Sequence, residues 1–224
     1  MPLFDELLIK IARNDRLTPL ELETFSQEVR SLTEVKTLVK SFIGGDGKIL
    51  GSYLNLPLEL IYSQVLEQDR TAITINVPSI FRNLFVMGSG SVTVASGGNI
   101  WAQFNGDTGA NYAWQLISAD GATLTSSEDT SHTAVALGVF GTTGAGAGVN
   151  GSFRSEIIHY TGPWKKNVLS HTYTAEFNDM YLMGSTWANV SPITSIEIFG
   201  TDNTLAKGTA SLAAGSLFTV YGVQ

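Results

Sequence analysis

The chain has 224 residues, a formal net charge of −7, no cysteine, and only 15% charged residues. The absence of cysteine excludes a disulfide scaffold, thiol catalysis and a cysteine zinc site. The 13 basic residues are scattered along the chain and form no patch that would neutralise a phosphate backbone, so nucleic acid is not an expected partner. Low charge with 23 glycines predicts a mainly β protein with many tight turns.

The opening residues carry acidic side chains early and lack the basic start, apolar centre and small-residue cleavage site of a signal peptide. No apolar run approaches the ~18 residues that cross a bilayer. We therefore expect a protein made in a cytoplasm, with no membrane partner.

The first 47 residues have a helical period and are predicted to form an N-terminal helical anchor and oligomerisation segment. Thr18, Pro19 and Glu21 form a typical helix start, and the four residues 44–47 end the helix with glycine. Between them runs an apolar seam spaced alternately three and four residues apart, which Lys36 interrupts once: Leu22, Phe25, Val29, Leu32, Val39 and Ile43.

Two arrangements bury this seam. The helix can form a hairpin with the short helix expected at residues 3–11, or copies of it can pack around a symmetry axis. We predict a homotrimer with these six residues at the interface. Residues 48–70 are expected to be a connector, either with a short helix from about residue 56 to 68 or as an extended arm.

From residue 71 onward the period changes to two, with about ten short strands separated by turn residues. This pattern predicts an antiparallel β-sandwich or jelly roll over residues 71–224. Gly88-Ser89-Gly90 is expected to be a hairpin turn between two strands, and the glycine-rich residues 141–151 a flexible loop. Residues 105–109, NGDTG, are expected to be a tight turn that Asp107 stabilises, because two side chains are too few for a calcium site.

The sequence has no pattern that indicates catalysis, a cofactor or a metal site. His132, His159 and His171 stand apart from any second ligand at metal spacing, and no Gly-x-Ser-x-Gly elbow is present. The most distinctive candidate contact is a turn over residues 161–166, TGPWKK, in which Pro163 fixes the backbone beside an aromatic side chain. We expect Trp164, Lys165 and Lys166 to form a surface contact there.

Three β segments, FNGDTGANYAWQ at 104–115, SIEIFGTDNTLAKGTASL at 195–212 and LFVMGSGSVTV at 84–94, resemble a recurrent β domain in minor virion proteins of tailed bacteriophages. The helical opening LTPLELETFSQEVRSL at 17–32 is similar to the segment that precedes such domains. The resemblance implies a virion accessory protein, often trimeric, with an N-terminal anchor and an outward β-sandwich. It supplies no catalytic residues.

The expected function is therefore a non-enzymatic role in the virion, as a capsid decoration protein, a head fibre or a tail-attached fibre. Its expected partners are other copies of the chain and other virion proteins of the capsid or tail. The alternative is a carbohydrate-binding or receptor-binding adhesin that recognises a host-surface glycan. In that case exposed aromatic rings would stack on sugars, and the candidates are Trp101, Tyr112, Trp114, Trp164, Tyr181 and Trp187. Trp101 and Trp114 are expected to lie in the core instead.

Overall fold

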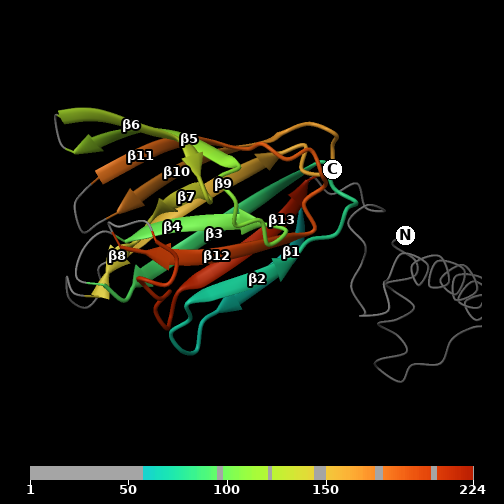
Figure 1. Cartoon of the computed structure of the whole chain (residues 1–224). Coiled ribbons are helices and arrows are strands. Elements are labelled where there is room, and N and C mark those ends of the chain that lie inside the picture. The colour runs from blue at the N-terminus through green and yellow to red at the C-terminus, as the bar shows by residue number, and fades with distance from the viewer. Residues whose placement is uncertain are drawn as a thin grey trace, which may run out of the picture. The chain divides into compact units, whose positions relative to one another are not determined.

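The computed structural model of the chain describes residues 58–94, 98–120, 123–143, 150–174, 179–202 and 206–223 (Figure 1). The chain divides into two compact units, Met1–Leu56 and Pro57–Gln224. The predicted helical anchor, with its seam residues Leu22, Phe25, Val29, Leu32, Val39 and Ile43, lies outside the described residues. The described part is mainly β with antiparallel sheets, as predicted, and it contains no apolar helix of membrane-spanning length.

The larger of the two sheets has nine strands. Eight of them are antiparallel neighbours in the order β1 (Glu59–Val65), β13 (Leu217–Val223), β3 (Asn83–Val92), β9 (Gly151–Ile158), β10 (Lys166–Thr174), β11 (Asp179–Trp187), β5 (Tyr112–Asp120) and β6 (Thr123–His132). The ninth, β8 (Gly141–Thr142), pairs in parallel with β3. Burial alternates along β10, so one face of this sheet is buried and the other is exposed.

The smaller sheet has four strands in the order β2 (Ala72–Asn76), β12 (Ser195–Thr201), β4 (Asn99–Phe104) and β7 (Val135–Val139). In Figure 1 it lies in front of the larger sheet. Leu84, Val86 and Phe218 from the larger sheet share one buried cluster with Ile75 and Ile198 from the smaller sheet. Each such side chain contributes about 1.5–3 kcal/mol through its removal from water, so the faces between the sheets hold the unit together.

The edge strand β7 lies against the inner face of the larger sheet, and all its residues are buried. Serine and threonine hydroxyls from the larger sheet bond to its peptide groups. Ser185 Oγ accepts from the N–H of Ala136 at 3.2 Å, and Thr172 Oγ1 accepts from the N–H of Val139 at 3.2 Å. Because a buried peptide group without a partner costs stability, these small polar side chains allow an edge strand to be buried in the core.

Two segments differ from the sequence prediction. Residues 59–65, expected to belong to the connector, form β1 and pair with β13, so the extended alternative for this segment is correct and the helical one is wrong. Residues 123–132 form β6, which the sequence did not indicate because none of its ten residues is buried.

The predicted turn at Gly88-Ser89-Gly90 is wrong, because β3 runs through it without a break. An added Cβ at Gly88 would lie 2.5 Å from the Phe153 ring, and one at Gly90 would lie 2.1 Å from the Ser216 hydroxyl. Glycine in a strand interior marks either a bend or bulge or a place where another group approaches the backbone closely. These two glycines allow such a close approach inside β3.

Candidate functional site

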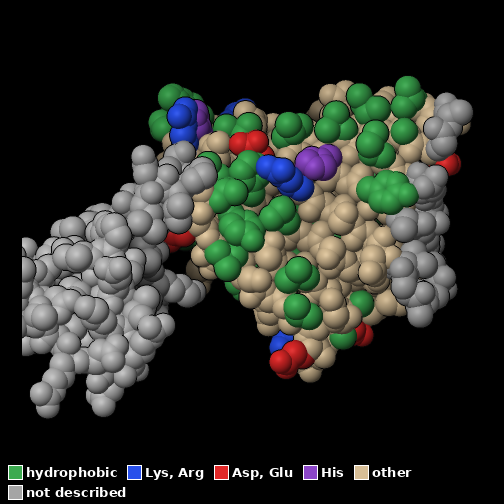
Figure 2. All heavy atoms as spheres, turned by 180° about the vertical axis from the view of Figure 1, so that it is seen from behind, with side chains coloured by type: hydrophobic (Ala, Val, Ile, Leu, Met, Phe, Trp, Pro, Cys, Tyr) green, Lys and Arg blue, Asp and Glu red, His purple; other side chains and the backbone are tan. Residues whose placement is uncertain are grey.

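The candidate site lies on the outer face of the larger sheet, where large apolar side chains are exposed. Strand registers place its outward side chains in rows that cross the strands. Seven large apolar side chains on β5, β6, β9, β10 and β11 are between 37% and 74% exposed: Ile117, Leu124, Ile158, Leu169, Tyr173, Met180 and Leu182. Figure 2 shows hydrophobic side chains spread over this face, with basic and histidine side chains near its middle.

An open groove of about 730 Å³ lies in this face, across β5, β10 and β11. Gly184 lies within it, and an added Cβ at Gly184 would meet no atom within 4 Å. The residues that line the groove include the apolar Leu169 and Leu182 and the polar Gln115 and Asn167. We call this outward surface of β5, β6, β9, β10 and β11 the apolar face.

Charged groups on the apolar face are few and ordered by the register. Arg154 on β9 lies opposite His171 on β10, and its guanidinium carbon is 4.5 Å from the centroid of the Phe85 ring. Glu156, two residues further along β9, accepts a hydrogen bond from Asn83 Nδ2 at 3.1 Å. A cation on an aromatic ring is stabilised without an acidic partner, so Arg154 keeps its donors available for a bound molecule.

Of the three residues predicted to form a surface contact around Trp164, the structure exposes two and buries the third. Trp164 is 55% exposed, and Lys165 is exposed beside it, but Lys166 is fully buried. Its ammonium donates to the carbonyl oxygens of Gly162, of Trp164 at 2.6 Å and of Val190 at 3.2 Å. Burial lowers the pKa of Lys166, while the carbonyl oxygens favour its charged form. The prediction of Lys166 as a surface residue is therefore wrong, because this side chain holds the turn from inside.

The other candidate aromatic residues are mostly internal. Trp101, Tyr112, Trp114 and Trp187 are all at most 9% exposed, which confirms the expectation for Trp101 and Trp114. Tyr181 is half-buried, and its hydroxyl donates to Asp179 at 3.0 Å. Burial and this carboxylate raise the pKa of Tyr181 to about 12. Of the aromatic rings proposed for sugar stacking, only Trp164 is exposed among the described residues.

The three histidines do not come together. Arg154 lies opposite His171, and His159 follows the end of β9 with a left-handed φ of 50°. The His159 ring accepts a hydrogen bond from Arg82 at 2.8 Å. The His132 ring stacks on Trp101 with 4.5 Å between ring centroids. Within the described ranges, no three histidine or acidic side chains group as metal ligands would.

Hydrogen bonds from several elements meet at the turn formed by residues 105–109. The Asp107 carboxylate accepts from the Gly109 amide at 2.9 Å, as the sequence predicts for a stabilised turn, and also from Asn111 and from Trp187 Nε1 at 2.8 Å. Asn105 adopts φ 54°, and its Oδ1 accepts from the amide of Thr194 at 2.8 Å. The turn therefore ties β4 and β5 to β11 and to the segment before β12.

The carboxylate of Asp107 has a lowered pKa. Burial alone would raise this pKa, but the hydrogen bonds from Trp187, Gly109 and Asn111 together outweigh burial. The same donors satisfy the carboxylate within the fold, so Asp107 is committed to structure and not to a ligand.

The sequence analysis missed the apolar face. A signal was present, because several strands have apolar residues at adjacent positions where alternation predicts only one: Leu116 and Ile117, Ile157 and Ile158, Val168 and Leu169, Leu182 and Met183. In each pair one side chain faces the core and the other faces outward, so a second apolar surface follows from the period of two.

No protein-family model matches the chain, and no curated protein matches it in sequence. Among solved structures, it is similar to the crystal structure of A. japonicus CB05, at 9% identity over 75% of this chain and 26% of that chain, with a TM-score of 0.29. It is also similar to the Ruminococcus gnavus IT-sialidase CBM40 bound to α2,3-sialyllactose, at 9% identity over 74% and 95% of the two chains, with a TM-score of 0.27. The metal-free lectin I-B4 from Griffonia simplicifolia gives 8% identity over 73% and 79%, with a TM-score of 0.24. Similarity at these values transfers neither ligand nor function to this chain.

Proposed function

We propose that this chain is a non-enzymatic structural protein of a tailed-bacteriophage virion, in which residues 1–47 anchor the protein and the β unit is displayed as a β-sandwich of the jelly-roll kind. The observation that carries a binding role is the apolar face. Single exposed apolar side chains are ordinary, whereas seven large ones gathered on one face of a sheet are typical of a binding surface. The resemblance of three β segments and of the helical opening to minor virion proteins supports a virion as the assembly to which the chain binds.

The virion role has a direct test. Particles purified on a density gradient from a lysate of producing cells should contain the chain at a fixed ratio to the major capsid protein, as measured by quantitative mass spectrometry. A chain that remains entirely in the soluble fraction at the top of the gradient would contradict the proposal.

A second candidate function is attachment to a host-surface glycan through Trp164. The favouring observation is that an exposed indole stands on a turn whose carbonyl groups are held by the buried ammonium of Lys166. A ring with a fixed backbone stacks on a sugar with little loss of conformational freedom.

Trp164→Ala separates the two functions, because truncation of a 55% exposed side chain removes little core packing. If the turn binds a glycan, adsorption of particles to cells falls while the amount of protein on the particle is unchanged. If it contacts another virion protein, the amount on the particle falls instead. Ile80→Ala, at a side chain 56% exposed in another loop, is the matched control and should change neither.

A further inference from the structure

The centre of the apolar face is self-complementary in shape. On β11, Leu182 and Gly184 are two residues apart, so both lie on the outer face of the sheet, in adjacent rows. Leu182 is 50% exposed, whereas Gly184 leaves open space where a side chain would stand. One position offers an apolar knob, and its neighbour offers a hole.

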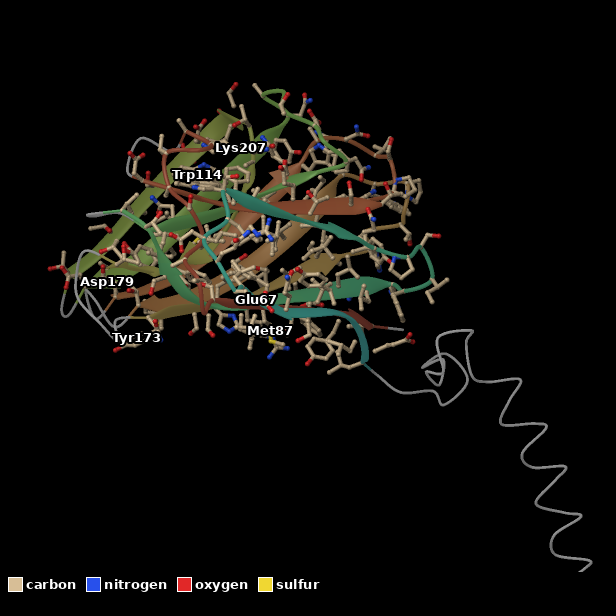
Figure 3. The ribbon with its side chains drawn as sticks, turned by 90° about the horizontal axis from the view of Figure 1, so that it is seen from below. Glu67, Met87, Trp114, Tyr173, Asp179 and Lys207 are labelled. Carbon is tan, nitrogen blue, oxygen red and sulfur yellow. The ribbon has the colours of Figure 1, made fainter. Side chains whose placement is uncertain are left out.

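The same two rows are complementary in charge. On β9, Arg154 and Glu156 are also two residues apart, and the register places them in the rows of Leu182 and Gly184. The ion pair found in the described part of the chain joins Lys207 to Glu197, at a site remote from these residues, so Arg154 has no acidic partner there. In Figure 3, Tyr173 and Met87 mark the side of the molecule that carries the apolar face, opposite Lys207.

We propose that the apolar face binds a second copy of this chain through a twofold axis that lies in the face and crosses the strands between these two rows. Such an axis exchanges the rows. It places Leu182 of one copy over the partner's Gly184, and Arg154 of one copy beside the partner's Glu156. Each contact occurs twice, as an isologous interface requires.

The size of the face fits this partner. With strands about 4.8 Å apart and outward residues about 6.8 Å apart along a strand, five strands and four rows cover roughly 650 Å². Two copies would bury about 1,300 Å², within the range of stable specific interfaces. Packed sheets cross at about 30° because of their twist, so contact is closest at the axis, where the two complementary pairs lie.

A flat apolar face could also bind a sugar, and two features favour the second copy. The groove around Gly184 has no aromatic side chain exposed in it for stacking, since the lining ring of Trp114 belongs to the core. In the central rows Arg154 and Glu156 also carry opposite charges at the spacing that the twofold axis exchanges, and the axis places Glu128, at the β6 edge, beside the partner's Ser126 and not beside another carboxylate.

The test is the mass of the full chain as a function of concentration, measured by sedimentation velocity for wild type and five variants. Gly184→Leu fills the hole, and the open space there lets the monomer keep its fold. Arg154→Glu and Glu156→Arg each place like charges together across the axis, and the double variant restores opposite charges. Val65→Glu, at a 57% exposed apolar position on β1 at the far edge of the same sheet, is the matched control.

We expect wild type and Val65→Glu to show the same concentration-dependent doubling of mass. Gly184→Leu should raise the dissociation constant at least about thirtyfold, the size of an interface hot spot. Each charge reversal should also weaken association, and the double variant should recover most of it. Unchanged melting temperatures would exclude misfolding as the cause. Residues 1–57 are identical in all variants, so any association through them does not alter the differences.

Three results would overturn the proposal. The wild type could show no concentration-dependent doubling, or Gly184→Leu could leave the doubling intact, or the double charge variant could associate no better than the single ones. If the wild type does not associate but binds to a glycan array, and Gly184→Leu abolishes this binding, the face is a sugar site instead.

Discussion

Asp107 shows how one residue can hold several elements together. Its carboxylate receives hydrogen bonds from Gly109, Asn111 and Trp187, and Trp187 is only 1% exposed. Removal of the carboxylate leaves a buried indole N–H without an acceptor. The cost is therefore larger than that of a lost turn bond, because the full desolvation penalty of that group remains.

We expect Asp107→Ala to lower the free energy of unfolding by about 2 kcal/mol, compared with about 1 kcal/mol for an isolated turn bond. Urea denaturation measures the change. In a double-mutant cycle, Trp187→Phe should remove much of the effect of Asp107→Ala, since the two side chains share one hydrogen bond. Strict additivity of the two substitutions would show that this bond does not contribute.

The pH dependence follows from the lowered pKa of Asp107. Because the folded-state pKa lies below the unfolded value of about 4, the stabilisation is fully present above that value and is lost as pH falls through the folded-state pKa. The difference in unfolding free energy between wild type and Asp107→Asn should therefore shrink as the pH is lowered from 7 to 3. A difference that stays constant over this range would contradict the charged role.

At the scale of single elements, β7 shows how a buried edge strand is satisfied. Thr172 accepts from the Val139 amide, and its hydroxyl donates to the Ser152 carbonyl at 2.6 Å. Thr172→Val keeps the shape of the side chain and removes both bonds. The expected loss is about 2 kcal/mol by chemical denaturation. Thr219→Val, on the outward side of β13, is the control and should change stability by less than about 0.5 kcal/mol. Equal effects would show that the hydroxyl at β7 is not needed.

Gly88 and Gly184, two of the glycines in the larger sheet, predict opposite responses to a methyl group. Gly88→Ala on β3 brings a Cβ within 2.5 Å of the Phe153 ring and 3.1 Å of the Phe140 ring, in the packed core. Overpacking of this kind costs about 1–3 kcal/mol. Gly184→Ala on β11 meets open space and should lie within about 0.5 kcal/mol of wild type. A neutral Gly88→Ala would show that the two phenylalanine rings move apart freely.

At the scale of the whole molecule, the two units are expected to be separable. The β unit, Pro57–Gln224, has its own core and both sheets. A protein that lacks residues 1–47 should unfold cooperatively in urea with a midpoint close to that of the β unit in the full chain. On particles it should be absent, because the proposed anchor is missing. Occupancy at the level of the full chain would contradict the anchoring role.

The apolar seam predicts a second mode of association that is independent of the apolar face. In the full chain carrying Gly184→Leu, light scattering should give three chain masses if the seam forms a trimer. Val29→Glu in the same background should reduce this to one chain mass, whereas Ser31→Glu, outside the seam, should not. A single chain mass without Val29→Glu would favour the intramolecular hairpin.

The sequence by itself determined the mainly β class, the turn at Asp107 and the internal position of Trp101 and Trp114. Each depends on local chemistry: alternation of side chains, residues that tolerate left-handed φ, and the tendency of large aromatic rings to be buried. The exposure of Trp164 was also predicted from its turn.

Only the tertiary structure decided the rest, because it depends on which strands become neighbours. In the sequence Gly88 is typical of a turn, whereas in the fold it lies in a strand against the Phe153 ring. Lys166 is typical of a surface cation in the sequence, whereas in the fold three carbonyl oxygens surround its ammonium. Adjacent apolar residues in the strands indicate a second apolar surface, but its neighbours need the register, since Leu182 and Ile117 are far apart in sequence and directly opposite in the sheet. Pairing across distant strands is fixed by the packing of the whole unit, and local sequence patterns carry no information on it.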